Sequence, residues 1–260
     1  MSLLNFFRTT LGLKIIMGVT GFMLFGFVVG HLIGNLQVFL GAATINAYAE
    51  FLHSLGKGLW VIRIGLIAVL VTHVWAAVTL AHRNRAARNE QYAENTSYKA
   101  SVASRTMMIT GSILLGFIIF HIFHFTVRNI PGLEYTAANY TEVMSDGETR
   151  FDVYNMMISG FSHWWVSALY ILGMAALGFH LSHGVASAFR SLGLMTAAYR
   201  KIEEYFAAGI SSSLVVGYSI IPIMVLVGVL HYERPVGGVE HASEAASPPS
   251  SITLNTKEAY

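Results

Sequence analysis

Cysteine is absent from the 260 residues of this chain. Disulfides, thiolate metal sites and cysteine-ligated iron–sulfur clusters are therefore excluded within it. Charge is also scarce, because Asp, Glu, Lys and Arg together make up 12% of the residues, about half of the roughly 25% found in ordinary soluble domains. The basic residues lie near the ends of apolar runs and form no groove, so we expect no nucleic-acid partner.

Five long segments contain no charged residue at all: 15–49, 64–82, 106–127, 153–189 and 205–232. A helix that crosses the hydrocarbon core needs roughly 20 apolar residues, and each segment can hold one. Hydrophobic residues make up 54% of the chain. We therefore predict an all-α membrane protein whose residues 1–232 form a single five-helix bundle. The predicted spans are 13–40, 58–82, 105–128, 163–189 and 209–231, and a polar tail, 233–260, follows them.

The basic residues near the span ends predict the orientation of the chain, because cytoplasmic connections carry an excess of Lys and Arg. The N-terminal end and the second-to-third and fourth-to-fifth connections hold ten of them, and the opposite side holds six. This predicts an integral protein of the bacterial cytoplasmic membrane with its N-terminus inside and its C-terminus outside. Trp60, Trp164 and Trp165 would then lie at the outer interface, which tryptophan favours.

Two connections on the predicted outer side carry additional features. The segment 41–57 has apolar residues at helical spacing, and we expect it to lie along the membrane surface. The segment 129–162 is long and acidic in its middle, and we expect an ordered cap or a short interfacial helix there. The tail after Tyr232 is rich in Pro, Gly and Ser and is expected to be flexible or ordered by a partner.

Eleven histidines are the most informative residues, and six of them lie inside the predicted spans: His31, His73, His121, His124, His180 and His183. Ionisable residues at this depth are rare and usually functional. At a rise of about 1.5 Å per residue, His31 and His121 lie roughly 7 Å on the outer side of the span middles. His73 lies about 4–5 Å, and His180 about 6 Å, on the inner side. Depth therefore predicts two levels, each with one histidine from each of two helices.

Two imidazoles per level suit the iron of a b-type haem, whose plate fits between apolar helices. Zinc normally takes four protein ligands, or three and a water, and proton relays usually include Asp or Glu, which these spans lack. Gly26, Gly30 and Gly34 form a stripe beside His31. The stripe can either make room for a flat cofactor or serve as a small-residue helix contact, and both interpretations stay open.

Four segments carry a resemblance to a known family: "VVGHLIGNLQVF", "VTHVWAAVTLAHR", "TGSILLGFIIFHIFHF" and "GFHLSHGVASAFRSLG". Over roughly residues 10–232 the chain resembles the di-haem cytochrome b subunit of type B succinate:quinone oxidoreductases and fumarate reductases. The resemblance implies five spans enclosing two haem b groups. It implies axial ligands at His31, His73, His121 and His180, with the pairs His73/His180 inner and His31/His121 outer.

The family pattern also separates neighbouring histidines. In that family the third-helix ligand lies eleven residues after the Thr of a Thr-Gly pair, which implies His121 over His124. The fourth-helix ligand opens a His-x-Ser-x-Gly pattern, which implies His180 over His183. The two remaining histidines, His124 and His183, are expected to face a haem edge, a propionate or a neighbouring helix.

The resemblance implies that the chain anchors a complex and transfers electrons between an iron–sulfur subunit and a quinone, either menaquinone or ubiquinone. Succinate would be oxidised, or fumarate reduced, on a separate flavoprotein subunit, so FAD and the iron–sulfur clusters belong to partners. Near the outer level, Asn46 and Glu50 are the quinone-binding candidates. The alternatives are another membrane cytochrome b, of the hydrogenase or formate dehydrogenase type, and a haem-free anchor or transporter.

Overall fold

The computed structural model describes residues 6–87, 106–133, 135, 140–143, 149–194 and 197–233. Its long helices are α2 (Thr10–Asn35), α4 (Lys57–Ala86), α6 (Met107–His121), α8 (Trp164–Ser191) and α9 (Arg200–Leu226). The shorter elements are η1 (Leu36–Leu40), α3 (Ala42–Ser54), η3 (Ile122–Val127), α7 (Val153–Ser162) and η4 (Ala197–Tyr199). The predicted tail and the basic residues of 88–105 lie outside the described residues.

Five helices are long and apolar enough to cross a membrane: Thr10–Leu40, Lys57–Ala86, Met107–Val127, Trp164–Ser191 and Arg200–Leu226. Large apolar side chains such as Ile64, Leu172 and Val216 are more than half exposed on their outer faces. A contiguous apolar surface of this kind is typical of a protein that contacts lipid or partners. The mostly helical, five-span architecture expected from the charge-free segments is therefore present.

The last long helix differs from its predicted bounds, since α9 covers Arg200–Leu226 and the prediction was 209–231. Its first turns carry Arg200, Lys201 and Glu204 on the exposed side, while Glu203 and Ala207, four residues apart, are buried. An amphipathic start of this kind contains charges and cannot be found from apolar runs alone. The helix ends before Gly228, whose φ of 77° leaves the helical region.

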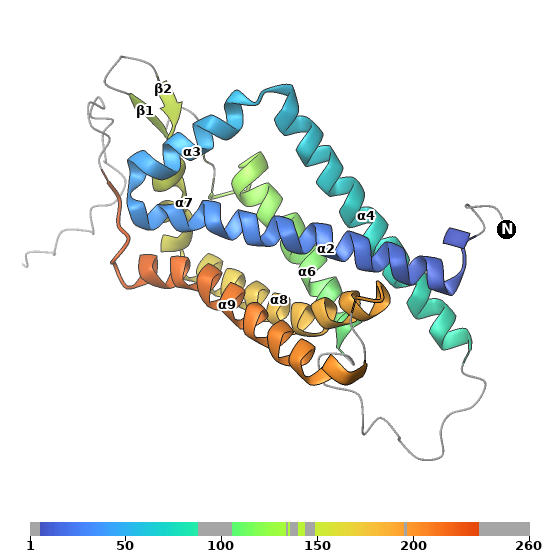
Figure 1. Cartoon of the computed structure of the whole chain (residues 1–260). Coiled ribbons are helices and arrows are strands. Elements are labelled where there is room, and N and C mark those ends of the chain that lie inside the picture. The colour runs from blue at the N-terminus through green and yellow to red at the C-terminus, as the bar shows by residue number, and fades with distance from the viewer. Residues whose placement is uncertain are drawn as a thin grey trace, which may run out of the picture.

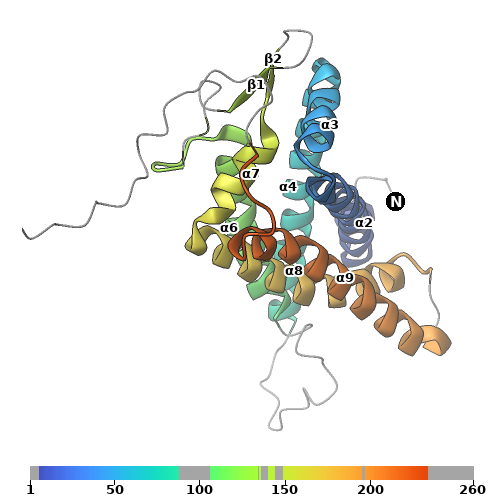
Figure 2. The same ribbon diagram turned by 90° about the vertical axis from the view of Figure 1, so that its left-hand side faces the viewer.

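The helices pack in neighbouring pairs. Helix α2 lies along α4 and α8, α6 lies along α8, and α8 lies along α9 for most of its length. Figures 1 and 2 show α8 and α9 side by side in both views. Helix α6 does not stop at His121, because the chain continues as a turn of π-helix over Ile122–Val127. Such π-turns interrupt regular packing and are often found at functional sites.

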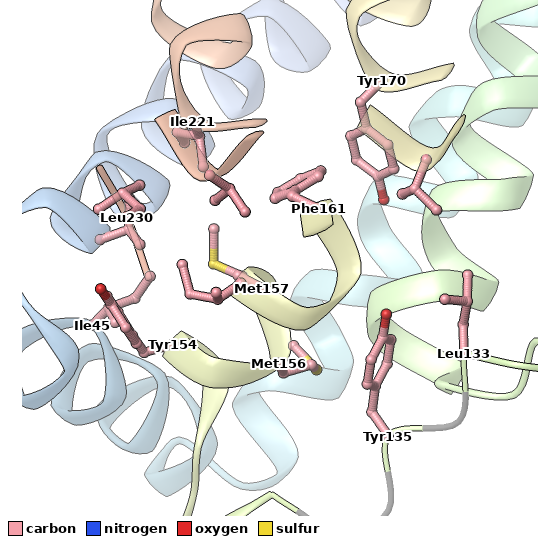
Figure 3. Packing of buried hydrophobic residues seen from close by; sticks show 14 residues of the cluster. Ile45, Leu133, Tyr135, Tyr154, Met156, Met157, Phe161, Tyr170, Ile221 and Leu230 are labelled. Carbon is pink, nitrogen blue, oxygen red and sulfur yellow. The ribbon is translucent and has the colours of Figure 1, made fainter. Parts of the chain in front are cut away.

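An ordered cap covers one end of the bundle, where α3, α7 and a two-stranded hairpin meet (Figure 1). The strands β1 (Thr141–Val143) and β2 (Thr149–Phe151) pair antiparallel with Glu142 opposite Arg150. The main hydrophobic core lies beneath this cap and includes Ile45, Tyr154, Met157, Phe161 and Leu230 (Figure 3). The connection 129–162 therefore contains a short helix, as expected, and also a hairpin that the sequence analysis did not predict.

Candidate functional site

The outer level brings together His31 of α2 and His121 of α6. Their ring centroids are 5.8 Å apart and their planes are inclined by 78°. Aromatic rings line the pair, since Phe27 stacks on His31 at 5.3 Å and Phe117 stacks on His121 at 6.1 Å. Two imidazoles from different helices therefore meet in an apolar setting.

The two histidines predicted for the inner level are His73 of α4 and His180 of α8, and each lies against a threonine of a different helix. The hydroxyl Oγ1 of Thr20 on α2 lies 3.0 Å from His73 Nδ1. In the same way, Thr110 Oγ1 on α6 lies 3.3 Å from His180 Nδ1. Each inner histidine thus contacts a threonine hydroxyl from a neighbouring helix.

The two levels are separated by the same number of residues on two helices. His31 follows Thr20 by eleven residues on α2, and His121 follows Thr110 by eleven residues on α6. At about 1.5 Å per residue this interval is about 16 Å of helix. The structure therefore places His31 beside His121, and it places His73 and His180 beside the threonines that lie eleven residues earlier on the same two helices.

The two histidines of α6 have different surroundings. His124 is fully buried, and both of its ring nitrogens are bonded: Nδ1 lies 2.9 Å from Tyr170 Oη, and Nε2 lies 3.0 Å from Tyr135 Oη. His121 uses only Nδ1 in this network, at 3.1 Å from the same Tyr170 hydroxyl. Figure 3 shows the hydroxyls of Tyr135 and Tyr170 pointing toward one another. His124 could therefore bind a metal only if one of these two hydrogen bonds were broken.

Sequence reasoning did not identify these tyrosines. Burial raises the pKa of Tyr135 well above its ordinary value of 10, and the neighbouring Tyr140 adds to the effect. The Tyr135 hydroxyl therefore stays protonated and remains available as a hydrogen-bonding group. No local pattern marks it, because its partner is brought near only by the turn after η3.

His183 lies one turn beyond His180 on α8, within electrostatic range of both His180 and Arg190. Arg190 Nε lies 3.2 Å from Glu203 Oε1, and the Glu203 side chain is 1% exposed. The geometry of this ion pair is not that of a hydrogen bond. Along α8, His183 therefore lies between His180 and Arg190, and Arg190 joins α8 to α9 through Glu203.

The quinone candidates Asn46 and Glu50 both belong to α3, but their environments differ. Asn46 is 1% exposed, and its amide donates to Glu142 Oε2 at 2.8 Å and Asp152 Oδ1 at 3.1 Å. Its carbonyl oxygen accepts from the Tyr154 N–H at 2.9 Å. The Asn46 side chain therefore fastens α3 to the hairpin and to α7. Its role as a quinone ligand stays a prediction.

Glu50 has an exposed position at a small pocket. Its carboxylate lies 3.7 Å from Arg150 Nη1, and its side chain is 48% exposed. Together with His53, Arg150 and Phe151 it lines a cavity of ≈ 230 Å³. This cavity combines an acid, an imidazole and a guanidinium with an aromatic ring, whereas the buried Asn46 does not reach it.

The glycine stripe of α2 divides into two parts. A Cβ added at Gly26 or Gly30 would meet nothing within 4 Å, so neither residue makes a close helix contact within the described chain. A Cβ at Gly34 would lie 2.8 Å from the Tyr48 ring, so Gly34 allows α3 to pack closely. The helix-contact interpretation therefore holds for Gly34, while Gly26 and Gly30 face open space and their role stays a prediction.

A repeat in the sequence links the two levels and was missed by the sequence analysis. Residues 17–31 and 107–121 share Met, Thr, Gly, Leu, Gly, Phe and His at seven of fifteen equivalent positions. The repeat contains the hydroxyl that contacts an inner histidine and the outer histidine itself. Aligning the chain with itself would have identified Thr20 as the equivalent of Thr110.

No protein-family model, curated protein or solved structure matches this chain.

Proposed function

We propose that this chain is the membrane-anchor and electron-transfer subunit of a succinate:quinone oxidoreductase, holding one b-type haem at each histidine level. The proposal rests on the resemblance described above. The single observation that supports it is that α2 and α6, whose His31 and His121 lie side by side, each carry a threonine eleven residues earlier that contacts His73 or His180, about 16 Å along the helix. His73 and His180 would hold the inner haem, and His31 and His121 the outer one.

The donor set fits haem better than it fits a bare metal ion. A porphyrin supplies four nitrogens to its iron, so the protein has to add only two axial ligands. Among the described residues, no group of three or more His, Asp or Glu side chains converges on one point. When bound, each haem supplies a one-electron iron couple. The histidines of α2, α4, α6 and α8 would hold the haem groups, and the chain's own residues would orient their imidazoles.

A hydroxyl contact at Nδ1 supports the assignment at three of the four proposed ligands. Thr20, Thr110 and Tyr170 contact Nδ1 of His73, His180 and His121 respectively. Histidines that ligate a metal usually bond through their other ring nitrogen to a neighbouring group. His124 would not be an axial ligand, because both of its ring nitrogens are already hydrogen-bonded. His183 would lie near the inner haem without binding its iron.

The partners of the proposed function lie on opposite faces. The iron–sulfur subunit, with its flavoprotein, would dock at the cytoplasmic ends of α4 and α8, where the basic Arg83 and Arg190 lie. A quinone would bind on the outer side, near the cavity lined by Glu50, His53 and Arg150. The same haem ligands and quinone site would transfer electrons in either direction, for succinate oxidation with quinone reduction or for fumarate reduction.

Haem content tests this function directly. The purified wild-type chain is expected to show reduced b-type bands with dithionite and two haem b per chain. His180→Ala is expected to lose one haem, and the matched His183→Ala variant is expected to keep both. A colourless wild-type protein would refute the haem assignment and favour a haem-free anchor or transporter.

Partner identity needs a second measurement. The full complex, isolated through a tag on this chain, is expected to contain a flavoprotein and an iron–sulfur subunit and to reduce a quinone with succinate. Isolation of a hydrogenase or formate dehydrogenase catalytic subunit in their place would overturn the succinate assignment and leave the haem assignment intact.

A further inference from the structure

The hydrogen bonds of Thr20 reveal which nitrogen of His73 carries the proton. Thr20 Oγ1 lies 2.7 Å from the Ile16 carbonyl oxygen and 3.0 Å from His73 Nδ1. A hydroxyl has a single proton to donate, and a carbonyl oxygen can only accept it. The Thr20 proton is therefore used within α2, and its oxygen is left to accept a hydrogen bond from His73 Nδ1–H.

The same arrangement occurs independently on α6. Thr110 Oγ1 lies 3.0 Å from the Thr106 carbonyl oxygen and 3.3 Å from His180 Nδ1. Thr110 is only 6% exposed, so water does not replace these partners freely. The Thr110 oxygen must likewise accept from His180 Nδ1–H.

The residue after each threonine lets the imidazole approach. A Cβ added at Gly21 would lie 3.4 Å from His73 Cε1, and one added at Gly111 would lie 3.3 Å from His180 Cε1. Each Thr-Gly pair thus forms a seat in which the threonine meets Nδ1 and the glycine lies against Cε1.

We infer that Thr20 and Thr110 are positioning residues that hold His73 and His180 in the Nδ1–H tautomer, so that Nε2 of each ring carries the lone pair that binds iron. The redox consequence of this inference rests on the proposed haem function, whereas the tautomer does not. A hydrogen bond at Nδ1 fixes the ring orientation and increases the basicity of the other nitrogen. Two helices would in this way tune the same, inner haem.

Threonine-to-valine substitutions test the inference, because valine keeps the shape and removes the hydroxyl. Thr20→Val and Thr110→Val are each expected to weaken retention of the inner haem by about 10-fold or more and to raise its midpoint potential, since a less basic ligand favours ferric iron less. A tenfold change in that preference corresponds to about 59 mV for one electron. The outer haem should be unchanged in both variants, and Thr20→Ser and Thr110→Ser should behave as wild type.

Thr72→Val and Thr79→Val are matched controls. Their hydroxyls also bond the carbonyl four residues earlier, at 2.7 and 2.8 Å, and both residues are partly exposed on α4. Thr72 is the immediate neighbour of His73, so it controls for a methyl-for-hydroxyl exchange beside the ligand. Equal inner-haem potentials in Thr20→Val, Thr110→Val and the controls would overturn the inference, as would a shift confined to the outer haem.

The tautomer can be tested without haem. When the chain is prepared without haem and with ¹⁵N-labelled histidine, we expect Nδ1–H signals from His73 and His180. The His73 signal should change in Thr20→Val and the His180 signal in Thr110→Val, and both should stay unchanged in Thr72→Val. Unchanged spectra in all variants would overturn the inference. A colourless wild-type chain with the expected ¹⁵N changes would instead refute the haem function alone.

Discussion

Replacement of Asn46 by Ala is expected to loosen the outer cap. Asn46 is buried, and its side chain joins α3 to the hairpin and to the first turn of α7 through three hydrogen bonds. Two of these go to carboxylates, on Glu142 and Asp152, and hydrogen bonds to charged groups contribute about 1.5–3 kcal/mol each. The variant therefore removes three hydrogen bonds of the cap at once.

The expected loss of stability in Asn46→Ala depends on the hydrogen bonds that each partner of Asn46 retains. Glu142 retains Arg150 Nε at 3.0 Å, and Asp152 retains the Asn155 N–H and amide at 3.0 and 2.6 Å, so the lower figure of about 1.5 kcal/mol applies to each. The Tyr154 N–H is buried and would lose its acceptor, which costs about 1 kcal/mol more. We expect the free energy of unfolding to fall by about 4 kcal/mol in total.

The assay is unfolding in detergent followed by far-UV circular dichroism, with Glu50→Gln as the matched variant on the same helix. Glu50 is half exposed, and its only described ion pair is 3.7 Å long, so its loss should cost at most about 1 kcal/mol. A cost below about 1 kcal/mol for Asn46→Ala would refute the cap reasoning. It would return Asn46 to consideration as a ligand-binding group.

Three other outcomes are expected. Burial alone would raise the pKa of Glu142, but hydrogen bonds from Arg150 and Asn46 outweigh this effect and hold the pKa below the ordinary 4.5. The stability that ionised Glu142 contributes is therefore present above pH 4.5 and is lost as the pH falls through the lower pKa of the folded state. Acid titration of unfolding in the wild type and in Glu142→Gln checks this. Gly173→Leu should lower the free energy of unfolding by about 1–3 kcal/mol through overpacking, because an added Cβ would lie 2.7 Å from the Phe117 ring. At Gly209 an added Cβ meets open space, so a thermal midpoint of Gly173→Leu equal to that of Gly209→Ala would contradict the prediction. Tyr170→Phe removes one hydroxyl from two histidine nitrogens and should cost about 1–3 kcal/mol; unfolding unchanged from wild type would exclude the network as a stabilising element.

The five long helices could be predicted because a helix that spans the hydrocarbon core of a membrane must be long and apolar. The same argument fails at the start of α9, where Glu203 is buried against α8 while its neighbours stay exposed. It fails again in the cap, where soluble-type turns and a hairpin are set by local hydrogen bonds. Amphipathic and irregular segments carry no continuous apolar signal.

The histidines could be selected by depth, but their partners could not. Thr20 and His73 are 53 residues apart, and His121 and Tyr170 are 49 apart. Such contacts depend on how helices pack, which periodicity does not encode. The 17–31 and 107–121 repeat is the exception, since it shows in one dimension that a threonine and a histidine belong together.

That repeat also explains why the two levels keep their separation. Helices α2 and α6 each carry a Thr-Gly seat at the inner level and a histidine at the outer level, whereas α4 and α8 contribute only the inner histidines. The distance between levels is therefore fixed by about 16 Å of continuous helix on two elements, and side-chain packing has little influence on it. Helix α8 reaches both levels, because its His180 contacts Thr110 and its Tyr170 hydroxyl lies 3.1 Å from His121 Nδ1. A movement of α8 would therefore disturb both histidine levels, whereas a movement of α4 would act on the inner level through the contact between His73 and Thr20.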